Sequence, residues 1–269
     1  MRGYESAIRA IARLMVAELR LPLPGRLVVF VYPTRAEYEE GLVRQGGLSP
    51  TGAARITIAS LGLAQQRRLF VNDEALRGAP RRAWLGLVAH ELTHVAQYEL
   101  AGGRRGRSEQ WLREGMADWV SARILDRLGE ADVDERRGRA LRAVAAVDTD
   151  GHEPLDLVVL GHPRGWRARL SEVGTAATYG LAFLLTDELV RRHGLAGLIT
   201  YFRAFDGSDD RFGHFQRAFG ESLREFAPRT LDRIRLEARA VPRVVECGEV
   251  SSRDADREVP PSGVLDGCW

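Results

Sequence analysis

Residues 84–94 read Trp-Leu-Gly-Leu-Val-Ala-His-Glu-Leu-Thr-His, an apolar run that leads into a His-Glu-x-x-His motif. In a helix, His90 and His94 lie one turn apart on one face, so both imidazoles can bind a single metal ion. Glu91 lies beside them, close enough to accept a proton from water without being a ligand. A chance match on a surface helix, with solvated histidines, is the alternative. The apolar lead-in instead favours a buried helix, in which these polar groups need a metal or other partners.

A second stretch supplies the rest of a metal site. Residues 111–119 read Trp-Leu-Arg-Glu-Gly-Met-Ala-Asp-Trp, beginning shortly after the first motif. A catalytic zinc ion takes three protein ligands and keeps one position open, so the two histidines leave one ligand to find, and Glu114 is the candidate. Asp118 shares its helix face and can accept a hydrogen bond from a ring N–H of His90 or His94. We therefore expect one zinc ion per chain, bound by His90, His94 and Glu114.

The two stretches together resemble those of the gluzincin metallopeptidases, in which HExxH is followed by a glutamate ligand on the next helix. Residues 111–119 are similar to the WLxEGxA segment of the aminopeptidase-N-like branch, and closer still to the EGxAxW segment of small bacterial peptidase MA-like domains. The resemblance implies that His90, His94 and Glu114 are zinc ligands and that Glu91 is the general base.

The resemblance also singles out a tyrosine. Residues 178–194 are similar to the family's helix that starts with a tyrosine and ends with glycine. In the relatives this tyrosine, here Tyr179, donates a hydrogen bond to the tetrahedral intermediate. A packing role at the start of a buried helix is the alternative. The Gly-x-Met-Glu-Asn motif, which binds the free α-amine in true aminopeptidases, is missing, so the resemblance does not extend to aminopeptidase specificity.

The fold that the resemblance implies is α+β and thermolysin-like. A small N-terminal sheet, with an edge strand packed on the zinc helix, is followed by a mainly helical lobe. We expect a peptidase MA-like catalytic domain over residues 1–240, with lobes at about 1–128 and 129–240, and a loosely ordered tail over 241–269.

In the relatives, the strand just before the zinc helix borders the cleft and pairs with an extended peptide. Here that strand is predicted at residues 68–72, which would place Leu69, Phe70, Val71 and Asn72 at the substrate. An ordinary edge strand without a substrate role is the alternative.

Periodicity and breaking residues predict the remaining elements. Strands are expected at 27–32, as a central strand, at 55–60 and at 68–72. Ser108 is the expected N-cap of the second metal-site helix. Helices are expected at 4–20, 34–42, 80–100, 108–128, 138–146, 176–193, 195–205, 211–219 and 222–238, and an irregular stretch at 151–165.

Composition excludes several other classes of function. The chain has 269 residues, 45 % of them hydrophobic, and its 39 basic and 37 acidic residues give a net charge of +2. This balance shows no signature of nucleic-acid or membrane binding. Every basic residue is arginine, which excludes lysine Schiff-base chemistry and is typical of a GC-rich bacterial genome. Among the arginines, the run 104–107 is expected to be a solvated connection, with an anion site as the alternative.

Other features leave their questions open. No signal peptide or membrane-spanning segment is visible, so the compartment is undetermined. Cys247 and Cys268 form either a disulfide or two free thiols. His152 is the first accessory oxyanion donor to consider, and three further histidines are more typical of structural or surface positions: His162, His193 and His214.

These observations predict a zinc metallopeptidase acting on a peptide or protein substrate. A zinc-stabilised binding domain without turnover is a second hypothesis, although its usual signature, a lost base at Glu91, is absent. A zinc amidase acting on non-peptide amides is a third. The sequence leaves endo- or exopeptidase action and oligomeric state open.

Overall fold

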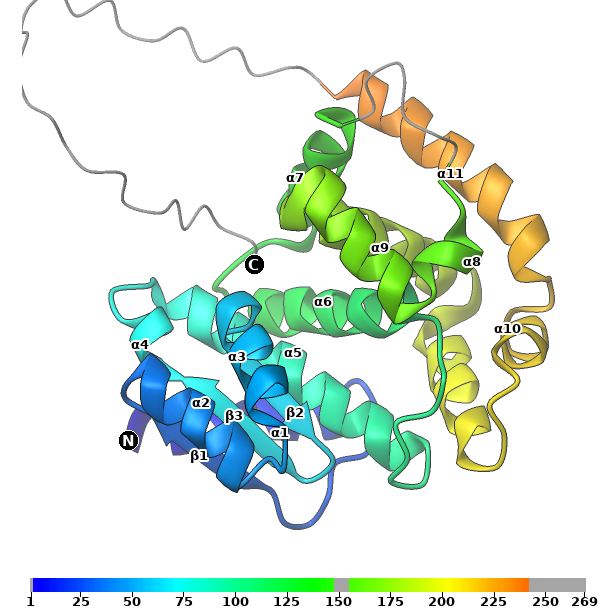
Figure 1. The fold of residues 1–269 in the computed structure, drawn as a ribbon. Coiled ribbons are helices and arrows are strands. Elements are labelled where there is room, and N and C mark those ends of the chain that lie inside the picture. The colour runs from blue at the N-terminus through cyan, green and yellow to red at the C-terminus, as the bar shows by residue number, and fades with distance from the viewer. Residues whose placement is uncertain (1, 148–154, 242–269) are drawn as a thin grey trace, which may run out of the picture.

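The computed structural model describes residues 2–147 and 155–241, and within them the protein is an α+β molecule that is mostly helical (Figure 1). Three short strands form one sheet in the N-terminal half, and helices make up the rest. The elements are α1 (Arg2–Ala17), β1 (Val28–Tyr32), α2 (Arg35–Arg44), α3 (Pro50–Ala59), β2 (Gly62–Gln65), β3 (Arg68–Asn72), α4 (Asp73–Leu76), α5 (Arg81–Leu100), α6 (Gln110–Arg127), α7 (Val133–Ala145), α8 (Leu157–Leu160), α9 (Pro163–Arg203), a 3-10 turn (Ala204–Asp206), α10 (Arg211–Phe219) and α11 (Leu223–Ala240).

Some sequence-based expectations fall on other parts of the chain. His152, Cys247, Cys268 and the tail beyond residue 241 lie outside the described residues. In the described part of the chain, no helix has the length and apolar character needed to cross a membrane.

The sheet corrects two expectations about strand position. Its order is β1-β3-β2, with β1 parallel and β2 antiparallel to β3. The strand at 68–72, expected at the edge, is therefore central, and the strand near 27–32, expected in the centre, is at an edge. Leu69 and Val71 pack toward α5 while Phe70 packs toward α2 and α3, so β3 is buried on both faces. Such a continuous apolar run is typical of a strand covered on both sides.

The strand expected at residues 55–60 is a helix. The run Ile56-Thr57-Ile58 is β-branched and suggests a strand, but it lies within α3. Ser49 caps this helix by accepting a hydrogen bond from the Gly52 main chain, 3.1 Å away, and Pro50 occupies its first turn. These start signals outweigh the weak strand preference of the branched residues.

Helices α5 and α6 run next to each other through the middle of the molecule, with α5 between the sheet and α6 (Figure 1). Pro80 directly precedes α5, close to the predicted start. The N-cap of α6 is Glu109 rather than Ser108, because the Ser108 hydroxyl accepts a hydrogen bond from Arg113 instead. Gly115 lets α6 approach α9 closely, since a Cβ there would overlap atoms of Ala182 and Thr186.

Helix α9 is interrupted twice, and the interruption at Gly194 is the break predicted between residues 193 and 195. The stretch 151–165 was expected to be irregular, but its described part contains α8 and the first residues of α9. Gly174 and Gly194 have φ values of 79° and 66°, in the left-handed region that glycine tolerates. The segment between them corresponds to the helix expected at 176–193, and the segment after Gly194 to the one expected at 195–205. The middle segment packs on α6 and brings Tyr179 to the metal-site helices. Helix α7 starts five residues earlier than expected, at Val133, where Asp132 caps it.

Candidate metal centre

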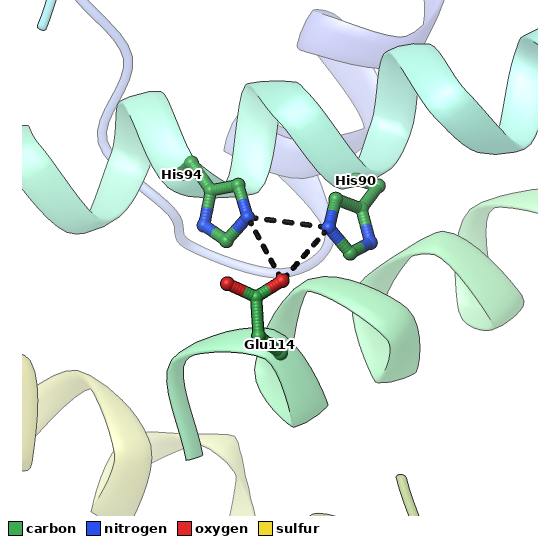
Figure 2. A group of neighbouring side chains, drawn as sticks. All are labelled: His90, His94 and Glu114. Atoms are coloured by element: carbon green, nitrogen blue, oxygen red, sulfur yellow. Dashed lines mark hydrogen bonds and ion pairs between the residues drawn. The ribbon is translucent and has the colours of Figure 1, made fainter. Parts of the chain in front are cut away.

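Three predicted ligand groups converge between α5 and α6. His90 and His94 project from one face of α5, and Glu114 faces them from α6 (Figure 2). The two Nε2 atoms lie 3.2 Å apart, and Glu114 Oε2 lies 3.4 Å from His90 Nε2 and 3.5 Å from His94 Nε2. Three donor atoms thus form a nearly equilateral triangle, with His90 and Glu114 buried and His94 half-buried.

The size of this triangle fits a zinc ion. Zinc binds imidazole nitrogen and carboxylate oxygen at about 2.0–2.2 Å, so tetrahedral ligands lie about 3.3–3.6 Å from each other. The three separations in the structure fall within that interval or about 0.1 Å below it. Two imidazoles and one carboxylate are also a donor set that leaves one tetrahedral position open.

His90 is oriented by a chain of two further side chains. Its Nδ1 donates to Asp118 Oδ1 at 3.0 Å, since a carboxylate can only accept. Asp118 Oδ2 in turn accepts from Arg136 Nη2 of α7 at 2.9 Å, and the Arg136 guanidinium lies 4.7 Å from the Phe183 ring centre. With Nδ1 occupied, the ring directs Nε2 to the shared centre.

His94 has a separate partner that the sequence analysis did not identify. Its Nδ1 lies 2.9 Å from Oε1 of Gln97, which is buried one turn further along α5. Gln97 Nε2 donates to the Arg113 carbonyl at 2.9 Å, which fixes the amide so that its oxygen faces the ring. His94 therefore also directs Nε2 to the centre. The i, i+3 spacing of His94 and Gln97 is the signal that could have found this partner.

The charges around the centre favour a cation there. Burial alone would lower the pKa of His90, but hydrogen bonds to Asp118 and Glu114 raise it to about 10. Burial opposes ionisation of Glu114, yet the adjacent His94 and His90 hold its pKa well below the usual range. Glu114 is therefore ionised, and its charge favours a proton or a metal ion at the centre.

Glu91 lies on the sheet side of the centre. Burial raises the pKa of its carboxyl, the two histidines oppose this shift, and the main-chain N–H of Ala64 donates a hydrogen bond to it. A Cβ at Gly62 would lie 3.1 Å from Glu91 Cγ, so this strand approaches the side chain closely. The strand that borders the centre is thus β2, and not β3, whose residues Leu69–Asn72 were expected there.

Tyr179 reaches the centre from α9. Its ring lies 6.3 Å from the His90 ring and packs edge-on against Trp166 at 5.1 Å. Burial, the charges of Glu114, Asp118 and Glu91, and a hydrogen bond to Glu114 hold its pKa well above the ordinary value. The hydroxyl therefore remains a proton donor at neutral pH.

A cavity of about 170 Å³ opens onto these groups. Residues from β2, the segment before it, α5, α6, α9 and the α5–α6 loop line it: Ser60, Gly62, Leu63, Ala64, His90, Glu91, His94, Tyr98, Arg105, Arg113, Glu114 and Tyr179. A larger cavity, of about 380 Å³ between the segment that follows α1, α6 and α9, is lined by none of the metal-site side chains.

The remaining described histidines serve other parts of the fold. His162 caps α9 by accepting from the Arg164 main chain at 3.2 Å. His214 is buried in α10 with Nε2 3.1 Å from the Ser208 carbonyl, and His193 packs against Phe219. None of the three lines the cavity beside the metal centre.

Comparison with known proteins adds no relative, because no family model, curated protein or solved structure matches the chain. Sequence reasoning missed two orienting residues, Gln97 and Arg136. It also missed that β2, which contains Ala64, is the strand that borders the centre. Arg136 has no sequence signal, because it lies on a different helix from the carboxylate it contacts.

Proposed function

We propose that this chain is a zinc metallopeptidase of the gluzincin type. The observation that carries the proposal is the convergence of His90 Nε2, His94 Nε2 and Glu114 Oε2 at zinc-like separations. The small sheet ahead of the histidine helix, and the glutamate helix after it, agree with the thermolysin-like arrangement that the motifs imply.

His90, His94 and Glu114 would hold the metal. Zinc bound there would act as a Lewis acid that polarises an amide carbonyl and lowers the pKa of a water to about 7. Asp118 and Gln97 keep the two imidazoles in the orientation that binding requires.

Glu91 is the proposed general base. Its carboxylate is held at the cavity wall by the Ala64 main chain, and burial raises its pKa, which makes it a stronger proton acceptor than an exposed carboxylate. It would take a proton from the attacking water and deliver it to the leaving amine. The protonated Tyr179 hydroxyl, next to Glu114, would donate a hydrogen bond to the developing oxyanion.

Metal analysis combined with a cleavage assay tests this function. Purified protein should contain one zinc ion per chain and cleave an unstructured substrate such as casein. A chelator should stop cleavage and added zinc should restore it. Glu91→Gln keeps the side-chain shape but cannot accept the proton, so zinc should remain while cleavage falls by several orders of magnitude.

The outcomes separate the competing readings. Zinc without cleavage of peptides by the unmodified protein would favour a zinc-stabilised binding domain, or an amidase with another substrate. Full zinc occupancy in His94→Ala would overturn the ligand assignment. Cleavage by Glu91→Gln at the original rate would show that another group is the base.

A further inference from the structure

The loop between α5 and α6 carries three arginines, Arg104, Arg105 and Arg107, and the structure assigns them different partners. Arg104 Nη2 lies 3.3 Å from Asp209 Oδ2, and its Nη1 donates to the Phe205 carbonyl at 3.1 Å. The Arg107 main chain donates to Asp209 at 3.1 Å, and its side chain lies 4.0 Å from the same carboxylate. These two arginines tie the loop to the segment before α10.

Arg105 differs from its neighbours in the loop. It is exposed and lines the cavity together with His94, Glu114 and Tyr98. Among residues 2–147 and 155–241, no carboxylate lies within ion-pair distance of its guanidinium. Arg105 thus lines the cavity beside the metal centre, and its guanidinium has no acidic partner in the described chain.

The main chain of Arg105 is held in place by a buried arginine, Arg113. Arg113 Nη2 donates to the Arg105 carbonyl and, at 2.9 Å, to the Ser108 hydroxyl. The Arg113 guanidinium also lies 5.8 Å from the Phe202 ring centre, and its hydrogen bonds go to neutral oxygens in the described residues. Because Arg113 directly precedes Glu114, the loop has a fixed position relative to a metal ligand.

The cavity has a strand on another of its walls. Gly62 and Ala64 of β2 line it, and β2 pairs with β3 along one edge only in the described sheet. The Gln66 side chain donates to the Gly103 carbonyl at 3.3 Å, so the β2–β3 turn lies beside the arginine loop. An extended chain placed along β2 would run past the metal centre and close to this loop.

We propose that Arg105 forms a subsite for a carboxylate of the substrate, so that the protein prefers peptides with a negative charge close to the scissile bond. A guanidinium binds a carboxylate through two parallel hydrogen bonds, which gives both affinity and orientation. The inference rests on the proposed peptidase function. The carboxylate belongs either to an Asp or Glu side chain or to the free C-terminus, and both present the same group.

Paired peptides distinguish these sources. One series carries Asp or Asn at each of several positions on both sides of the cleavage site, and the other ends in a free acid or an amide. In one of the two series, wild-type protein should cleave the acidic peptide with a kcat/KM about 10–100-fold higher than that of its neutral partner. A preference in the first series identifies a side-chain carboxylate, and one in the second identifies the C-terminal carboxylate.

Variants of the loop assign the preference to one residue. Arg105→Gln should remove most of the preference for the acidic peptide over its neutral partner, and Arg105→Glu should reverse it. Arg107→Gln, on the same loop but paired with Asp209, is the matched control and should keep the preference. The proposal would be overturned if wild-type protein cleaved acidic and neutral peptides with equal kcat/KM. It would also be overturned if Arg105→Gln kept the wild-type preference.

Binding separates this inference from the catalytic one. The same peptides are titrated into Glu91→Gln protein and into Glu91→Gln/Arg105→Gln protein. Stronger binding of the acidic peptide, lost in the double variant, supports the subsite even where wild-type protein hydrolyses nothing. Hydrolysis without any difference between acidic and neutral peptides rejects the subsite and leaves the peptidase function standing.

Discussion

Asp118→Asn tests whether an orienting carboxylate sets the zinc affinity. In the protein, Asp118 accepts from His90 Nδ1 at 3.0 Å and from Arg136 Nη2 at 2.9 Å. Asparagine has one carbonyl oxygen in place of two carboxylate oxygens, so its NH₂ group would face one of the two donors. Both neighbouring side chains are largely buried, so water cannot fully replace the missing partner.

The expected size of the effect follows from which contact is lost. If Arg136 keeps the oxygen, His90 loses the acceptor that holds its proton on Nδ1, and Nε2 is no longer fixed as a ligand atom. If His90 keeps it, the Arg136 guanidinium faces an NH₂ group, and because asparagine is neutral the largely buried guanidinium loses its ion pair in both cases. Removing such an outer partner lowers metal affinity by about 10–100-fold, which corresponds to about 1.4–2.7 kcal/mol.

The assay is a competition between the protein and a chromophoric chelator for zinc, with thermal unfolding measured in parallel. The matched control is Asp126→Asn on the same helix, whose ion pair with Arg123 is long, at 3.9 Å, and solvent-exposed. It should bind zinc within about twofold of wild type, because exposed pairs contribute little. Zinc affinity of Asp118→Asn equal to that of the control would refute the orienting role.

Four further predictions concern the groups around the centre. Tyr179→Phe should lower kcat by about 10²–10³-fold with KM and zinc content unchanged, whereas unchanged steady-state kinetics would assign the tyrosine to packing. Gln97→Leu should weaken zinc binding by about tenfold or more in the chelator competition, and wild-type affinity would show that His94 needs no orienting partner. In the metal-free protein, burial lowers the pKa of His90 but Asp118 and Glu114 raise it to about 10, above its unfolded value of about 6.5. The stability that this proton contributes is therefore complete below about pH 6.5 and is lost as the pH rises through 10, which urea unfolding of chelated protein would measure. Since zinc must displace the same proton, its affinity should rise about tenfold per unit between about pH 7 and pH 9, and a flat profile would contradict the pKa.

Short-range patterns were enough to predict the metal-site helices. His90 and His94 share a face of α5 because of helical geometry alone, and the apolar run before them predicts a buried helix. Gly194 was likewise visible as a helix break, whereas the helical turns that precede Gly174 were not predicted. The local error at residues 55–60 arose because β-branched residues were given more weight than the Ser49-Pro50 helix start.

Longer-range features came only from the tertiary structure. Which strand borders the centre depends on the order in which the three strands pair. The sequence of Arg68–Asn72 does not show whether this strand lies in the middle of the sheet or at its edge. Arg136 contacts Asp118 only because α7 packs beside α6. Arg105 differs from Arg104 and Arg107 because Asp209, about a hundred residues later in the chain, lies beside two of them and not the third.

The sequence by itself determined which donor groups are available for a metal ion. The spacing of His90 and His94 on one helix follows from the local backbone alone. Only the tertiary structure decided which strand, which orienting side chains and which arginine surround that centre. These depend on contacts between segments far apart in the chain, whose energies come from packing and pairing that no local pattern encodes.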